Sequence, residues 1–149
     1  MQRRGQIFFL FRRTWQDQNF NYRFDGIVYA VSVSLGFAAF ENLEYVMGYG
    51  LAVAPSRALL AIPGHLSFAV LMGLFYGRAK RYENLGKTVA ARTYNTLSVV
   101  SAVFFHGFYD SCAMISTGES TIVFILFIAV MYLIVFRLTA REARNDRHL

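Results

Sequence analysis

The apolar run at residues 25–47, DGIVYAVSVSLGFAAFENLEYVM, constrains this chain more than any other feature. It is long enough to cross a bilayer as a helix, because about 20 residues rising about 1.5 Å each span the hydrocarbon core. It also carries a carboxylate, Glu41, which a lipid-exposed helix could not keep at that depth. An ionisable group inside a membrane span is costly and by default marks a functional site. The sequence therefore predicts a membrane helix whose acidic side faces other parts of the protein.

Three further apolar runs predict an all-α, polytopic membrane protein with four transmembrane helices. The hydrophobic fraction of 56% and the aromatic fraction of 17% support this class. The runs are too long and too uniformly apolar for the alternating strands of an outer-membrane barrel. We expect a single membrane domain over residues 1–149. Its predicted transmembrane helices cover residues 25–47, 58–77, 94–115 and 121–138.

The basic residues are grouped in segments that alternate with the apolar runs. They occur in residues 1–24, 78–92 and 137–147, and Arg57 alone lies between the first two runs. By the positive-inside rule, both termini are predicted to face the cytoplasm. The net charge of +6 follows from this topology, and no basic stripe predicts a nucleic-acid partner. Residues 1–24, basic and aromatic around a short apolar core, predict an interfacial amphipathic segment or a truncated helix.

Small residues indicate where the predicted helices approach one another closely. The first span carries an i, i+4 ridge of small residues, namely Gly26, Ala30, Ser34 and Ala38. The second span carries Gly73 and Gly77 at the same spacing. Pro63, also in the second span, removes a backbone donor and predicts a kink beside His65.

Four ionisable side chains fall inside three of the predicted spans. They are Glu41, His65, His106 and Asp110. Counted from the outer loops at about 1.5 Å per residue, all four lie roughly 7–14 Å below the outer surface. His106 and Asp110 stand at i and i+4, so they project from the same face of a helix. Two imidazoles and two carboxylates in one layer form the strongest functional signal in the sequence.

These side chains allow two kinds of chemistry. Without metal, Glu41 would act as a general base toward water, while a histidine and a neighbouring donor stabilise the oxyanion. With metal, the two histidines and the two carboxylates would ligate one divalent ion such as zinc, which lowers the pKa of a bound water. No HExxH motif is present and the four residues come from three separate spans, so their spacing does not choose between the two.

Residues 20–115 carry a series of short motifs in a fixed order. It comprises the DGIVY segment, the FxxxE motif from Phe37 to Glu41 followed by Asn42 and Tyr45, then Arg57, Pro63 and His65, and the HxxxD motif from His106 to Asp110. This ordered set resembles the PrsW family of intramembrane proteases, relatives of the CAAX-prenyl endopeptidases. The resemblance implies a multi-pass protein of the bacterial inner membrane. It also implies hydrolysis of a membrane-associated protein substrate, typically the first cut that releases an anti-sigma factor.

One motif of the family is not reproduced. The segment Gln2-Arg3-Arg4-Gly5-Gln6 stands where the family has EExxK, whose glutamates are thought to be catalytic. We therefore expect either a fragment with altered N-terminal residues or a member without proteolytic activity. In the site that remains, Glu41 is expected to bind water and the two histidines to contact an oxyanion or a metal. Asp110 is expected to orient a histidine or to act as a ligand.

Two other functions fit parts of the pattern. A four-span transporter working as a dimer would use Glu41 as its proton- or cation-coupled carboxylate, although it does not need the histidines. A catalytically inactive binding module would capture a membrane protein without cutting it. The sequence leaves the substrate, the metal and the formation of a homo-oligomer open.

Overall fold

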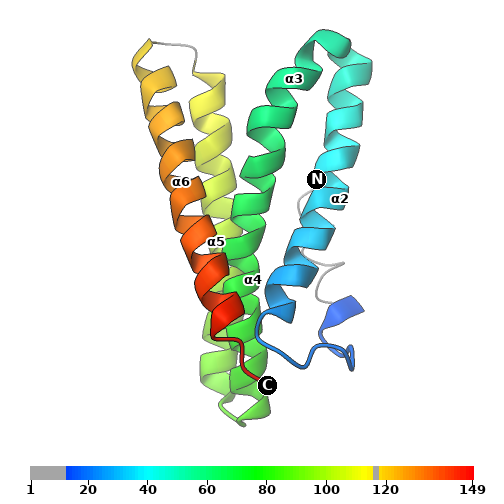
Figure 1. Cartoon of the computed structure of the whole chain (residues 1–149), viewed down its shortest axis with the longest axis vertical. Helices are drawn as coiled ribbons and strands as arrows, with labels where there is room; N and C mark the ends of the chain where they lie inside the picture. Colours follow the sequence, from blue (N-terminus) through cyan, green and yellow to red (C-terminus); the bar gives the residue numbers. More distant parts are fainter. Residues whose placement is uncertain (1–12, 116–117) are drawn as a thin grey trace.

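The computed structural model describes residues 13–115 and 118–149, and within them the chain is helical apart from turns and one isolated β-bridge. The long helices are α2 (Asp25–Tyr49), α4 (Ile62–Asn84), α5 (Thr88–Met114) and α6 (Gly118–Arg144) (Figure 1). The all-α class is therefore confirmed. The predicted interfacial or truncated helix lies, for residues 1–12, outside the described residues. Of residues 13–24, only the first two are helical.

The helices differ from the predicted spans by several residues at their ends, for local reasons. Gly50, at φ +81°, follows the end of α2 at Tyr49, two residues beyond the predicted end at Met47. α4 and α5 extend into the basic loop, because its residues are mostly good helix formers, and only a short turn with Gly86 at φ +71° separates the two helices. Between α2 and α4 lie three short turns, η1 (Leu51–Val53), α3 (Ala54–Ser56) and the π-helical η2 (Arg57–Ala61).

Three helical segments of the described chain are long and apolar enough to cross a membrane, by length and composition. They are Asp25–Tyr49, Leu51–Asn84 and Gly118–Arg144. α5 has 27 residues, as α6 does, but it is not among these segments. α5 carries hydroxyl and ionisable side chains along its length, including His106 and Asp110. The prediction of four spans is thus met by three segments on this criterion, and a membrane crossing by α5 stays a prediction.

α4 forms the centre of the molecule, with α2 on one side and α5 and α6 on the other (Figure 1). Most of its residues between Gly64 and Gly77 are buried. The segment before α2, the α4–α5 loop and the C-terminal tail lie at one end, and residues 50–57 lie at the other (Figure 1). The described parts of the basic segments, from residue 13 onward, therefore gather at one end of the bundle, although the direction in which that end faces stays a prediction.

The predicted ridge of small residues is the face that α2 presents to α4. Its four members, Gly26, Ala30, Ser34 and Ala38, are all buried. At the crossing the two backbones touch: a Cβ atom on Gly73 would lie 2.5 Å from the carbonyl oxygen of Gly26. A Cβ atom on Gly26 would lie 2.6 Å from the backbone nitrogen of Gly77. Since only glycine permits such an approach, the predicted close packing of these two helices is confirmed.

The predicted disturbance of the helix at Pro63 takes the form of a π turn. Within η2, the N–H of Ile62 donates to the carbonyl of Arg57, five residues back. Pro63 has no N–H with which to bond the carbonyl of Leu59, and the Tyr132 hydroxyl of α6 donates to that carbonyl at 3.4 Å. The proline thus leaves a backbone acceptor that α6 helps to satisfy.

The end of the bundle that carries the basic segments is closed by an ion pair. Glu142 of α6 is 8% exposed, and its carboxylate lies 2.5 Å from Nη2 of Arg23 and 3.5 Å from Nη2 of Arg78. It joins α6 to the start of α2 and to α4. A second pair, Lys80 and Glu83, lies on the surface of α4 with a separation of 3.2 Å.

Replacing Glu142 by Gln is expected to lower the free energy of unfolding by about 2 kcal/mol. Breaking a fully buried pair costs roughly 3–5 kcal/mol, and we expect less here because Arg78 stays partly solvated. Denaturation of the detergent-solubilised protein measures this difference. The matched control is Glu83→Gln, whose exposed pair is worth about 0–1 kcal/mol. Equal stability of the Glu142 variant and the wild type would contradict the prediction.

Candidate active site

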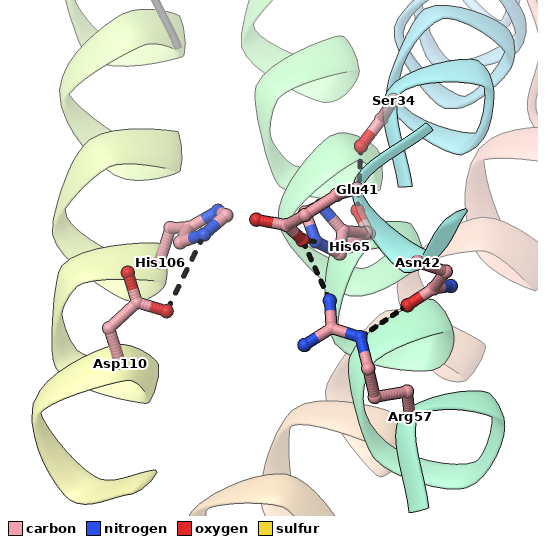
Figure 2. A network of polar contacts seen from close by, with 7 residues as sticks. All are labelled: Ser34, Glu41, Asn42, Arg57, His65, His106 and Asp110. Atoms are coloured by element: carbon pink, nitrogen blue, oxygen red, sulfur yellow. Dashed lines mark hydrogen bonds and ion pairs between the residues drawn. The ribbon is translucent and has the colours of Figure 1, made fainter. Parts of the chain in front are cut away.

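The four ionisable residues singled out in the sequence lie along one continuous row of contacts. Oε2 of Glu41 on α2 lies 3.0 Å from Nε2 of His65 on α4. The His65 and His106 rings meet edge to face, with centroids 4.9 Å apart. Nε2 of His106 lies 3.6 Å from Oδ1 of Asp110, one turn further along α5 (Figure 2). Three helices therefore bring all four predicted side chains together.

Packing around the imidazoles holds them in place. His65 is 6% exposed, and its backbone carbonyl accepts a hydrogen bond of 3.2 Å from the Ser34 hydroxyl. That bond joins α4 to the small-residue ridge of α2 at the level of the site. On the other side, Phe68 packs against the His106 ring with a centroid distance of 5.5 Å and against Tyr109 at 5.9 Å. Both histidines are thus positioned by neighbouring helices.

Arg57, to which the sequence analysis gave no chemical role, completes the site. Its Nη2 donates to Oε2 of Glu41 at 3.0 Å, the oxygen that His65 also contacts. Its Nε donates to Oδ1 of Asn42 at 2.6 Å, and its guanidinium lies 3.6 Å from the centroid of the Tyr45 ring. The signal in the sequence was its position, because it is the only basic residue between the first two apolar runs.

A cleft of about 680 Å³ opens beside Glu41 toward the end of the bundle that carries residues 50–57. Its walls come from α2, η2, α5 and α6 and combine polar with apolar side chains. They include Glu41, Tyr45, Arg57, Tyr109, Asp110 and Phe124. His65 is not part of the wall and is buried behind Glu41. The carboxylates and the arginine are therefore the groups that a molecule in the cleft would meet first.

The four side chains form two polar pairs, Glu41 with His65 and His106 with Asp110, rather than one cluster. No group of three His, Cys, Asp or Glu side chains within residues 13–115 and 118–149 converges as metal ligands would. Oε2 of Glu41, which contacts His65, also forms an ion pair with the Arg57 guanidinium. His106 and Asp110 form a separate pair. A divalent metal bound by these four residues therefore stays a prediction.

The family model for the PrsW family intramembrane metalloprotease matches residues 6–138. The chain belongs to the PrsW family. Protease PrsW of Halalkalibacterium halodurans is 32% identical to it over 140 residues, which cover 94% of this chain and 63% of the relative. Protease PrsW of Bacillus subtilis is 35% identical over 139 residues, covering 93% and 61%. Protease PrsW of Geobacillus kaustophilus is 40% identical over 96 residues, which cover 64% of this chain and 40% of the relative. No solved structure matches significantly.

Membership of the PrsW family confirms the resemblance read from the ordered motifs. Together with the three apolar segments, it identifies a membrane protein of a bacterial family of intramembrane proteases. The chain spans between 40% and 63% of the length of the three relatives named above. Nothing found supports the alternative of a proton- or cation-coupled transporter, since the matched relatives are proteases. The altered EExxK position lies outside the described residues.

Proposed function

We propose that this PrsW chain hydrolyses a peptide bond of a membrane-associated protein and that Glu41 is the general base. The observation that supports this is the way the Glu41 carboxylate is held. His65 and Arg57 anchor Oε2, while the other carboxylate oxygen points toward His106 (Figure 2). A carboxylate that lines a cleft and is fixed by one of its oxygens is suited to taking a proton from water.

The reaction uses one water molecule and leaves the side chains unchanged. Glu41 takes a proton from the water as the water oxygen attacks the peptide carbonyl carbon, and the carbonyl electron pair moves onto its oxygen. The tetrahedral oxyanion then collapses, and the C–N bond breaks as Glu41 returns the proton to the departing nitrogen. The products are a carboxylic acid and an amine. The acid then loses its proton to the amine or to solvent.

The neighbouring side chains serve this step in different ways. His65 was predicted to contact an oxyanion or a metal; here we propose that it orients Glu41, and its Nε2 contact with that carboxylate supports this. His106 lies across from the second Glu41 oxygen, where it would hydrogen-bond the attacking water (Figure 2). Asp110 is placed to orient His106. We therefore assign His65 and Asp110 positioning roles.

The two α5 residues are expected to differ in their effect on turnover. His106→Ala should lower kcat by about 10²-fold, the lower range for an acid–base group. Asp110→Asn should lower it by about tenfold, equivalent to an ordinary hydrogen bond of about 1 kcal/mol. The control is Ser111→Ala, whose hydroxyl bonds only the carbonyl of Gly107 in its own helix. A larger loss in Asp110→Asn than in His106→Ala would show that these roles are reversed.

The place of the cut follows from the position of the cleft. The cleft lies toward the end of the bundle opposite to the basic segments. If the positive-inside assignment holds, this end faces away from the cytoplasm, and the substrate is cut near the extracytoplasmic face. A membrane protein with one span, of the anti-sigma factor type, would present its juxtamembrane segment there.

Incubating the purified protein in liposomes with a single-span substrate tests the proposal. Two fragments that join at one bond near the outer membrane surface are expected. A substrate that is captured but stays intact would identify a binding module instead. Proton uptake that disappears in Glu41→Gln, without any cleavage by the wild type, would identify a transporter.

A further inference from the structure

We propose that Arg57 is a catalytic residue that binds the carbonyl oxygen of the scissile peptide and stabilises the oxyanion. This inference rests on the hydrolysis proposed above. It concerns the guanidinium that forms an ion pair with Glu41. The side chain of Arg57 is 17% exposed and forms part of the cleft wall.

The guanidinium is fixed on three sides. Nε donates to Asn42, Nη2 donates to Glu41, and the ring of Tyr45 lies against the guanidinium plane. These contacts leave the third nitrogen, Nη1, pointing away from both hydrogen-bond acceptors and toward α5 (Figure 2). The α5 residues in that direction include Asp110, which lines the same cleft. Nη1 is therefore a fixed donor directed at the space where a substrate would lie.

This placement meets the geometric needs of an oxyanion donor. The donor and the general base must both reach one reacting carbonyl, the base through a water and the donor directly. Glu41 and Arg57 share an ion pair of 3.0 Å, so they flank the same part of the cleft. A preorganised cation acts most strongly when negative charge develops in a site with little water. His65, which is bonded to Glu41 and buried behind it, is less suited to this task.

A purely structural role is the alternative to exclude. In that case Arg57 would only neutralise the charge of Glu41, and any substitution at Arg57 that preserved the fold would also preserve kcat. The catalytic role predicts that Arg57→Gln lowers kcat by about 10²–10³-fold, the usual effect of removing one oxyanion donor. KM is expected to change little, because the contact forms fully only in the transition state. Arg57→Lys, which keeps the charge but not the fork of donors, should recover part of the loss.

Chemical rescue of kcat by added guanidinium is a result that a purely structural role of Arg57 does not predict. Guanidinium ion added at millimolar concentration to Arg57→Ala should raise kcat at least tenfold, and NaCl at equal ionic strength should not. Asn42→Ala is the matched variant, because it removes an acceptor that holds Arg57 and leaves the guanidinium present. It should lose about tenfold in kcat, equivalent to one hydrogen bond, and should not respond to guanidinium. Absence of rescue in Arg57→Ala, combined with full activity of Arg57→Gln, would overturn the proposal.

Binding of a transition-state analogue separates this proposal from the proposed hydrolysis. The probe is the substrate peptide with a hydrated difluoroketone at the mapped scissile bond, compared with the same peptide carrying the ordinary amide. Wild type should bind the hydrate at least about 10²-fold more tightly than the amide. Arg57→Gln should lose that preference and keep its affinity for the amide. A preference retained in Arg57→Gln would overturn the role of Arg57 alone, whereas no cleavage and no preference in wild type would overturn both proposals.

Discussion

Replacement of Glu41 by Gln is expected to lower kcat for substrate cleavage by about 10³–10⁴-fold, within the range for loss of a general base. Glutamine has nearly the size of glutamate and still accepts hydrogen bonds from His65 and Arg57. It cannot, however, take a proton from water. Single-turnover cleavage in liposomes, followed by gel or mass spectrometry, measures the change.

The matched control for this variant is Glu44→Gln, because Glu44 lies one turn further along α2 and is exposed. It removes the same charge from the same helix outside the contacts of Glu41, and it should retain full activity. Denaturation of both variants shows whether the fold is kept. A Glu41→Gln protein that is folded and keeps more than a tenth of the wild-type rate would exclude Glu41 as the general base.

Replacement of Gly73 by Ala is expected to destabilise the protein by about 3 kcal/mol, the upper part of the usual range for overpacking. The added Cβ would lie 2.5 Å from both the carbonyl oxygen of Gly26 and Cα of Ile27. These atoms belong to a helix backbone and cannot rotate away, so α2 must move from α4. Because Glu41 and His65 lie on these two helices, a shift of about 1 Å should also lower kcat by about 10²-fold.

Gly36→Ala on α2 is the control for this change. Among residues 13–115 and 118–149, no atom outside its own helix backbone lies within 4 Å of the position that its Cβ would take, so we expect mainly the helix propensity to change. Alanine is favoured over glycine in a helix by about 1 kcal/mol, and this variant should therefore be slightly more stable than wild type. Unfolding in mixed detergent compares the two. Equal stability of the Gly73 and Gly36 variants would show that the helices can separate without cost at the crossing.

The helices and their contact face were predictable because each depends on a local pattern. A run of apolar residues predicts a membrane helix whatever lies around it, and the i, i+4 ridge from Gly26 to Ala38 predicts the face that packs. The meeting of Glu41 with His65 and His106 was also predictable, since ionisable groups at equal depth in lipid need one another as partners. Each of these predictions uses only the rise and period of a helix.

Other features depend on contacts that no local pattern describes. The sequence assigned Arg57 no chemical role, because its inward direction depends on η2, on Asn42 and on the Tyr45 ring. The choice between metal and no metal could not be made, because it depends on whether donors from three helices converge. The burial of Glu142 depends on Arg23, which lies 119 positions earlier in the chain.

Cleavage of a single-span substrate in water enriched in oxygen-18 tests most directly that Glu41 activates a water molecule for peptide hydrolysis. After a single turnover, mass spectrometry would measure the label in the new carboxyl terminus and in the enzyme peptide that contains Glu41. We predict one labelled oxygen in the product and none in Glu41. An intact substrate, or label transferred to Glu41 through a covalent intermediate, would contradict this account.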